Sequence, residues 1–330
     1  MTKEALLQWA KEVAEERKIT LGEILYSPAP NHGEDFRNVI FDATWNNQPA
    51  VLKMYDDHRL IHESESLVSF HKRNTCATLT APKLFDSGII DHRRGWVLME
   101  RMPNDSQRFS VPMSDNDREK FLDIFVDYRT HFPTTPDRPL NAIEQLSSAE
   151  FQKLRLHRWY ERAALADVER KRKGQPETLP VSELLPLYYS AMNIVSTGFA
   201  NRPMIWCHGH FKPQEVFIIN GRPYITDFGH MSMFPEGYEL GFIIWADYLT
   251  TPSRTVLAAE WIAGLESWIE AMITMAKKLH YQEPEQLVRA SVVERLLGTI
   301  LADVCAREFP LGEIKNRLVM LMPALEKLVR

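Results

Sequence analysis

The sequence has little cysteine and no excess of positive charge. Its 330 residues include three cysteines, which are far apart and form no CxxC pair: Cys76, Cys207 and Cys305. Neither a disulfide framework nor a cysteine zinc site is indicated, and a reducing cytoplasm fits best. The formal net charge of −5 counts against a protein that neutralises nucleic-acid phosphates, because such domains are usually basic on at least one face.

The sequence also lacks a long apolar run. The first 18 residues place apolar side chains at helical spacing among charged ones, unlike the continuous apolar core of a signal peptide. No later segment supplies the ~18 uncharged apolar residues of a membrane helix. We therefore expect a cytoplasmic protein without a membrane segment. The content of 45% hydrophobic and 25% charged residues is enough for two lobes with separate cores.

Residue patterning changes along the chain. After a first amphipathic helix, "FRNVIFDATW" and "PAVLKMY" are β-rich runs joined by the turn-forming "NNQP", and "GWVLMERM" reads as another strand. Helical spacing dominates later, except for short strand-like runs around "NGRP" within 204–228. The pattern predicts an α+β fold with two lobes: a small antiparallel-sheet lobe at 1–99, a hinge at 100–104 and a large, mainly helical lobe at 105–330.

Several other features have ordinary structural interpretations. Ser147 and Glu150 have the spacing of a capping box at the start of a helix. Asp247 is interpreted as a surface acid on a helix rather than a substrate contact. Three tryptophans have the spacing of buried helix faces: Trp245, Trp261 and Trp268.

The stretch "WCHGHFKPQEVFIINGRPYITDFGH" at 206–230 carries most of the chemical residues. Together with "VLKMY" upstream and "GYEL" at 237–240, it resembles the aminoglycoside phosphotransferase and choline kinase family, which shares the protein-kinase-like fold. The signature of that family is His-Gly-Asp, an Asn five residues after the Asp, a hairpin, and an Asp followed by Phe or Trp and often Gly. His208, Gly209 and the "DFG" at 227–229 match it.

The resemblance implies binding of ATP or another nucleoside triphosphate with Mg²⁺. Lys53 in "VLKMY", at the end of a strand, matches the lysine that binds the α and β phosphates. Glu63 matches the helix glutamate that pairs with this lysine, and Glu65 is a close competitor on a different helix face.

Two further nucleotide contacts rest on position. "NHGEDFRNVIF" lies where the family has its phosphate-covering turn, but Gly33 is the one glycine it offers, and phosphate binding needs backbone amides that small residues bring close. "VLMERM" resembles the connector between the lobes, where backbone groups near Glu100 and Met102 would bind adenine.

The catalytic signature departs from the family at two positions. His210 replaces the catalytic Asp, and Glu215 replaces the metal-binding Asn. With a neutral imidazole the formal charge is conserved, since one negative charge is lost at 210 and one is gained at 215. A histidine pKa of ~6.5 suits proton acceptance near neutrality, and carboxylates are hard metal ligands. The resemblance therefore implies His210 and Asp227 as catalytic residues and Asp227 and Glu215 as metal ligands.

The leading hypothesis is an ATP- and Mg²⁺-dependent phosphotransferase that acts on a hydroxyl of a small molecule, with no nucleic-acid or membrane partner. The acceptor and the oligomeric state stay open, as do two other functions, an inactive nucleotide-binding pseudokinase with a regulatory role and a kinase-like nucleotidyltransferase. A transition-metal site is a further alternative, because His208 and His210 on an extended strand would face one side, with His230 near Asp227.

Overall fold

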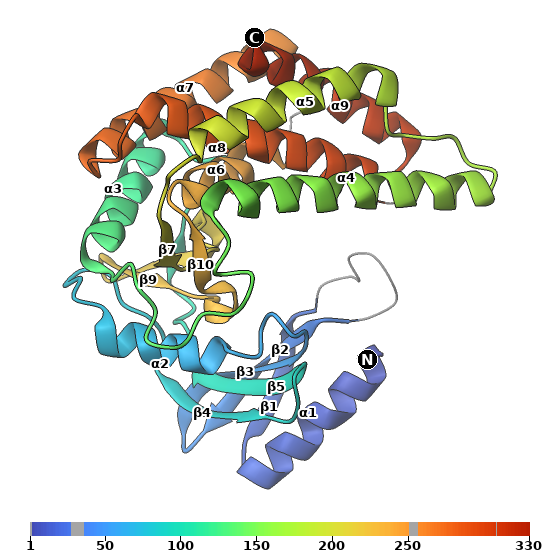
Figure 1. Cartoon of the computed structure of the whole chain (residues 1–330). Coiled ribbons are helices and arrows are strands. Elements are labelled where there is room, and N and C mark those ends of the chain that lie inside the picture. Colours follow the sequence, from blue (N-terminus) through green and yellow to red (C-terminus); the bar gives the residue numbers. More distant parts are fainter. Residues whose placement is uncertain (1, 28–35, 251–256, 308) are drawn as a thin grey trace. The chain divides into compact units, whose positions relative to one another are not determined.

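The computed structural model describes residues 2–27, 36–250, 257–307 and 309–330 (Figure 1). The chain forms two compact units. The first unit comprises Met1–Arg108, His131–Pro133 and Glu215–Met231. The second comprises Phe109–Thr130, Thr134–Gln214 and Ser232–Arg330. The expected domain boundaries at residues 99 and 105 stay a prediction.

The first unit is built on a five-stranded antiparallel sheet in the order β1-β2-β3-β5-β4. Its strands are β1 (Thr20–Tyr26), β2 (Asn38–Trp45), β3 (Gln48–Asp56), β4 (Leu84–Ile89) and β5 (Arg94–Glu100). Asn46 and Asn47 connect β2 to β3 with φ of 48° and 61°, the left-handed values that a tight hairpin turn requires and that asparagine tolerates. The predicted hairpin and strand are confirmed.

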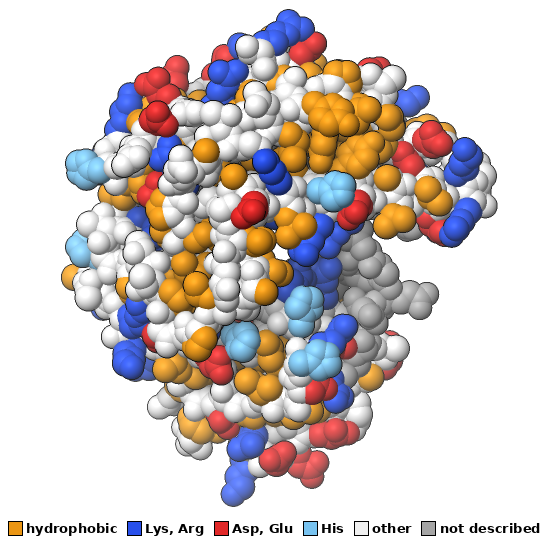
Figure 2. Space-filling view, viewed as in Figure 1, with side chains coloured by type: hydrophobic (Ala, Val, Ile, Leu, Met, Phe, Trp, Pro, Cys, Tyr) orange, Lys and Arg blue, Asp and Glu red, His pale blue; other side chains and the backbone are white. Residues whose placement is uncertain are grey.

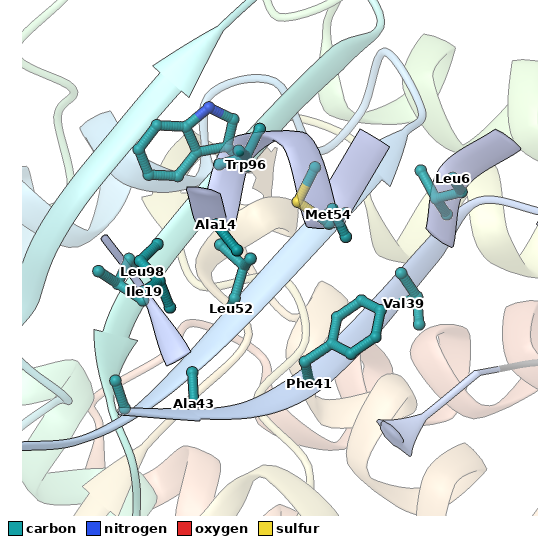
Figure 3. Close-up of a cluster of buried hydrophobic side chains, with 13 residues drawn as sticks. Leu6, Ala14, Ile19, Val39, Phe41, Ala43, Leu52, Met54, Trp96 and Leu98 are labelled. Atoms are coloured by element: carbon teal, nitrogen blue, oxygen red, sulfur yellow. The ribbon is translucent and has the colours of Figure 1, made fainter. Parts of the chain in front are cut away.

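Helix α1 (Lys3–Arg17) covers one face of this sheet and forms the main core of the unit. Thr2 caps the helix by accepting a hydrogen bond from the Ala5 N–H. Leu6 and Ala14 of α1 belong to the same cluster of buried side chains as Leu52 of β3 (Figure 3). The full cluster contains Leu6, Ala10, Val13, Ala14, Ile19, Val39, Phe41, Ala43, Ala50, Leu52, Met54, Trp96 and Leu98. Since side chains alternate along a strand, Lys53 points to the opposite face.

The opposite face of the sheet meets helix α2 and the second hairpin of the unit. Helix α2 (Glu63–Arg73) contacts β4 and the short 3₁₀ turn Phe228–His230. That turn follows the hairpin of β8 (Val216–Ile219) and β9 (Arg222–Ile225), and β6 (Gln107–Arg108) pairs with β8. The hairpin predicted around "NGRP" is confirmed.

The second unit is mainly helical, and α8 is its central element. Its helices are α3 (Asp115–His131), α4 (Ser148–Arg172), α5 (Val181–Gly198), α6 (Tyr238–Ile244), α7 (Ala258–Lys278), α8 (Pro284–Gly298) and α9 (Leu311–Val329). Most of α8 is buried, and α4, α5, α6, α7 and α9 all pack against it. The predicted capping box of Ser147 and Glu150 is present at the start of α4. The expected α+β class is therefore confirmed.

A two-stranded antiparallel ribbon also belongs to the second unit. It consists of β7 (Met204–Cys207) and β10 (Ser232–Pro235). Ser232 Oγ donates a 2.6 Å hydrogen bond to Glu144 Oε1, and Arg138 forms a two-pronged ion pair with the same carboxylate. Burial alone would raise the pKa of Glu144, but these donors outweigh it and hold the pKa at about 2.

The expected surface position of Asp247 is wrong, because its exposed fraction is only 1%. Asp247 Oδ1 accepts the Met113 N–H at 2.9 Å, and Oδ2 accepts Trp268 Nε1–H at 3.1 Å. A buried carboxylate is stable here because these donors replace water. Trp261 and Trp268 are buried as predicted, whereas Trp245 is only partly buried.

The outer surface of the second unit carries some large apolar side chains. Leu165 of α4 is 68% exposed and Tyr189 of α5 is 65% exposed, and apolar side chains gather around α5 in Figure 2. Within the described residues, every helix is too short or too polar to cross a bilayer.

Candidate nucleotide and catalytic site

Three charged side chains meet inside the first unit, on the face of the sheet opposite α1. Lys53 Nζ donates to Glu63 Oε1 at 2.9 Å and to Asp227 Oδ1 at 3.0 Å. The side chains of Lys53 and Glu63 are 5% and 3% exposed, and that of Asp227 is 20% exposed. Of the two candidate glutamates, Glu63 pairs with the lysine, while Glu65 binds His62 at the surface. β3 continues to Asp56, so Lys53 lies within the strand and not at its end.

The lysine is held in its charged form. Burial alone would lower the pKa of Lys53, but the carboxylates of Glu63 and Asp227 outweigh that effect and raise it. A compact ammonium fixed between two carboxylates is suited to binding a further anion as a point charge.

The backbone at Asp227 has an uncommon conformation. Its φ of 64° lies in the left-handed region, which costs energy for any residue other than glycine. The next side chain, Phe228, is buried against Phe70 of α2, with ring centroids 4.9 Å apart. A Cβ at Gly229 would lie 2.4 Å from Leu60 Cδ2, so glycine permits the close approach to the residues before α2. Packing thus aims the Asp227 carboxylate at Lys53.

Glu215 lies in the same unit and is held by Thr226, the residue between β9 and Asp227. Its Oε2 accepts a 2.7 Å hydrogen bond from Thr226 Oγ1, and its carbonyl accepts the Thr226 N–H at 3.0 Å. Glu215 is close enough to Glu63 to raise the pKa of that group, alongside the larger effect of burial. Glu63 and Asp227 thus contact Lys53 directly, and Glu215 adds a third carboxylate near Glu63.

The predicted adenine contacts lie at the end of β5. The Glu100 N–H donates to Lys83 O at 2.8 Å, and the Arg101 N–H donates to Pro49 O at 3.3 Å. Among the described residues, the Met102 N–H donates to no backbone acceptor. A backbone donor at this position fits the expected readout of adenine by main-chain groups. Gly33, the other predicted nucleotide contact, lies outside the described residues.

The histidine loop belongs to the second unit and follows β7. The His208 N–H donates to Tyr128 Oη at 2.7 Å, and the Gly209 N–H donates to Glu239 Oε1 at 3.1 Å. Arg129 lies 3.9 Å from Glu239 Oε2. Burial raises the pKa of Glu239, and Arg129 and the Gly209 N–H oppose that rise. A buried carboxylate and a phenol therefore fix the backbone of the loop.

His210 projects from this fixed loop. Its N–H donates to His208 Nδ1 at 3.3 Å, which assigns the proton of a neutral His208 ring to Nε2. The His210 ring stacks on Phe242 with centroids 4.8 Å apart and an interplanar angle of 23°. His208 itself is fully buried, as suits a residue that packs beneath the loop.

The expectation that His208 and His210 lie on an extended strand is wrong. β7 ends at Cys207, and Gly209 has φ of 73°, so the chain turns between the two histidines. His208 Nδ1 is also used by the His210 N–H. The geometry that motivated a transition-metal pair on one strand face is therefore absent from this loop.

Sequence reasoning missed the side chains that support the loop. "GYEL" was used only to fix the register of the motif, yet Glu239 is its direct hydrogen-bond partner. Tyr128 lies 80 positions before His208, and no pattern connects the two. The one available signal for Glu239 was its place directly after a glycine and a tyrosine and before an apolar run.

Asp227 and Glu215 offer carboxylate oxygens of the kind that a hard divalent cation prefers, and His230 Nε2 also lies 4.0 Å from Asp227 Oδ2. Asp227 Oδ1 accepts from Lys53, whereas its side chain keeps a 20% exposed fraction. Glu215 adds a second carboxylate with one oxygen bound to Thr226. Oxygen donors of this kind suit Mg²⁺ or Mn²⁺, and the ion would neutralise phosphate charge when bound.

No protein-family model matches the sequence, and a search of curated proteins finds no relative. Solved structures of similar fold do exist. Choline kinase from Cryptosporidium parvum Iowa II matches with a TM-score of 0.59 at 11% identity, over 98% of this chain and 96% of that one. Aminoglycoside 2′-phosphotransferase-IIIa, in a GDP complex of a mutant, matches with 0.58 at 11%, over 98% of both chains.

A thermostable mutant of aminoglycoside phosphotransferase APH(4)-Ia, in a ternary complex with ADP and hygromycin B, matches with a TM-score of 0.57 at 12% identity over 97% of both chains. These matches cover nearly the whole chain, and the resemblance drawn from the sequence motifs is confirmed at the level of fold. The protein has the kinase-like fold of aminoglycoside phosphotransferases and choline kinases.

Proposed function

We propose that the protein is an ATP- and Mg²⁺-dependent phosphotransferase that transfers the γ-phosphate to a hydroxyl of a small molecule. The observation that carries this proposal is the placement of Lys53 between Glu63 and Asp227. Burying a lysine and its carboxylate partners costs desolvation free energy, and such charged groups with shifted pKa values cluster at ligand-binding and catalytic sites.

Each residue has a defined part in the proposed function. Lys53 would bind the α and β phosphates, with Glu63 holding the ammonium in place. Asp227 and Glu215 would hold Mg²⁺, which neutralises the charge of the triphosphate. Met102 would donate its backbone N–H to adenine.

On the acceptor side, His210 would orient the hydroxyl and accept its proton. Its backbone is fixed by the bond to His208, and its ring by Phe242. A fixed imidazole matters because misplacement of a reacting group by ~1 Å can reduce the rate on the order of 100-fold. The similar structures are of enzymes whose names specify choline and aminoglycosides, which supports a small-molecule acceptor here.

The proposal is tested by incubating the full chain with ATP and Mg²⁺ or Mn²⁺ and a broad panel of hydroxyl compounds. ADP release and product mass are measured. Asp227→Asn should abolish transfer, whereas Asp91→Asn, at a partly exposed acid of the same unit that pairs with Arg94, should leave it unchanged. The proposal fails if the wild-type chain neither binds nucleotide nor transfers phosphate to any compound. A product carrying AMP would identify a nucleotidyltransferase instead.

A second candidate is a nucleotide-binding pseudokinase. It is favoured by the stacking of the His210 ring on Phe242, which gives this histidine a packing role that needs no catalysis. This function predicts that ATP raises the melting temperature without turnover. Under the enzyme proposal, His210→Ala lowers kcat while nucleotide affinity is kept.

A further inference from the structure

Two arginines and one glutamate are buried together in the second unit. Arg155 comes from α4, and Glu294 and Arg295 come from α8. Arg155 Nη1 lies 3.3 Å from Glu294 Oε1, and Arg295 Nε lies 3.3 Å from Glu294 Oε2. The side chains of Arg155, Glu294 and Arg295 are 16%, 2% and 7% exposed. These three side chains hold two positive charges against one negative charge, and Asp303 lies near enough to act on Arg295 as well.

The cluster has unused hydrogen-bonding capacity. Within the described chain, Arg155 Nη1 and both Nε and Nη2 of Arg295 are buried without an acceptor in hydrogen-bonding geometry. Buried donors of this kind are rare, because each loses its hydrogen bonds to water on burial. Burial also lowers the pKa of Arg155 against the opposing effect of Glu294. An additional anion would satisfy both the charge and the donors.

Aromatic rings pack close to both guanidinium groups. The ring centroid of Tyr238 lies 4.6 Å from the Cζ atoms of both Arg155 and Arg295, and that of Trp159 lies 4.7 Å from Arg155. A guanidinium stacked on a ring keeps its in-plane N–H groups available for a planar anion. This geometry suits bidentate binding of a carboxylate or phosphate.

Glycine makes room for one of these side chains. A Cβ at Gly241 of α6 would lie 2.4 Å from Ser291 O and 2.9 Å from Arg295 Cγ. The arginine stem therefore passes directly over the helix that carries Tyr238 and Phe242.

The cluster adjoins the proposed catalytic histidine through one ring. The Phe242 centroid lies 4.8 Å from Arg295 Cζ, and the His210 ring stacks on the same side chain at 4.8 Å. We infer that Arg155 and Arg295 form an anion subsite on the acceptor side, so that the small-molecule substrate carries a carboxylate or phosphate as well as its hydroxyl. This substrate class rests on the proposed function, whereas the anion site itself does not.

The inference separates this chain from enzymes with cationic acceptors. A quaternary ammonium such as that of choline would face two guanidinium groups, and like charges in a partly dehydrated site repel strongly. An acceptor with a negative group would instead gain charge-assisted hydrogen bonds.

The test is calorimetric titration of the full chain, without nucleotide, with three compounds of similar skeleton: glycerol 3-phosphate, glycerate and glycerol. At least one of the anionic compounds should bind with one site per chain and about 10-fold or more tighter than glycerol, as expected for hydrogen bonds to a charged group. The tighter of the two anions identifies the headgroup. Equal binding of all three, or binding of none, overturns the inference.

Variants locate the site. Arg155→Met should reduce anion affinity about 10-fold or more while the melting temperature stays the same or rises, because Glu294 keeps Arg295 as its partner. A purely structural cluster would instead lose thermal stability and keep any affinity. If that variant does not fold, Arg155→Lys keeps the charge without the planar fork and should still weaken binding.

Two controls complete the experiment. Arg317→Gln removes an arginine of the same unit that also stacks on a ring and pairs with an acid, and it should leave binding unchanged. Loss of binding in Lys53→Met, with Arg155→Met unaffected, would place the anion at the nucleotide residues and refute the inference. If the chain binds the anion but transfers no phosphate, the anion subsite is supported and the proposed phosphotransferase function is contradicted.

Discussion

The ion triad of the first unit predicts a strong energetic coupling between Lys53 and Glu63. Lys53→Met leaves the 3% exposed carboxylate of Glu63 buried without its cation, and breaking such a pair costs about 3–5 kcal/mol. Glu63→Met should cost less, about 1–3 kcal/mol, because Lys53 keeps its bond to Asp227.

The double variant removes both buried charges and fills the space with apolar side chains. It should lie within about 1–2 kcal/mol of the wild type, since buried ion pairs are often replaced without loss of stability. The coupling energy of the cycle should therefore be at least about 2 kcal/mol.

Hydrogen exchange of the amides in β3 (Gln48–Asp56) measures the coupling energy within the first unit. This measurement does not require both units to unfold together. Because its neighbours raise the pKa of Lys53, its contribution is fully present below the unfolded pKa of ~10.4 and is lost only as pH rises towards the higher folded value. The titration of Lys53 should thus leave the coupling unchanged up to about pH 9, whereas the pKa of Glu63, which burial raises, should make the coupling weaken as pH falls into the acid range. A Lys53→Met cost below about 1 kcal/mol, or a double variant as unstable as the sum of the single ones, would refute the reasoning.

Three further predictions concern the second unit. Glu144→Gln should lower the free energy of unfolding at pH 7 by about 1–2 kcal/mol, after allowance for solvent screening. Because the pKa of Glu144 is lowered to about 2, urea titrations should show the difference between variant and wild type shrinking as pH falls from ~4.5 towards that value. A difference that stays constant with pH would contradict this prediction. Gly241→Ala meets the backbone oxygen of Ser291 at 2.4 Å and should destabilise the unit by about 1–3 kcal/mol in thermal unfolding, whereas an unchanged melting temperature would show that α6 and α8 separate freely. Glu239→Gln should lower kcat with little change in KM for ATP, and equal effects on both would argue against its proposed role beneath the histidine loop.

Local sequence signals were sufficient for much of the fold. Alternating apolar residues and the paired asparagines at 46 and 47 predicted the β2–β3 hairpin, and the spacing of Ser147 and Glu150 predicted the start of α4. The sequence also narrowed the partner of Lys53 to two glutamates, and the helix phase of α2 places Glu63 towards the lysine.

Contacts between distant residues were beyond sequence reasoning. Asp247 was expected at the surface because nothing in its own helix shows that Met113 donates to it. Arg155 and Arg295 are separated by 140 positions, and each alone reads as an ordinary helix cation. The histidine pair was misassigned because a strand pattern continues through "WCHGHF", while the turn depends on the positive φ of Gly209.

The packing of Phe228 has a consequence for how this protein can evolve. Phe228 follows Asp227 directly and packs on Phe70, which lies seven positions after Glu63 on α2 and itself stacks on Phe132. A substitution that repacks these rings moves the Asp227 carboxylate and Glu63, the partner of the lysine, together. Substitutions within this aromatic cluster therefore change the positions of both carboxylates at once. A variant that changes the position of one carboxylate alone must carry its substitution outside the cluster.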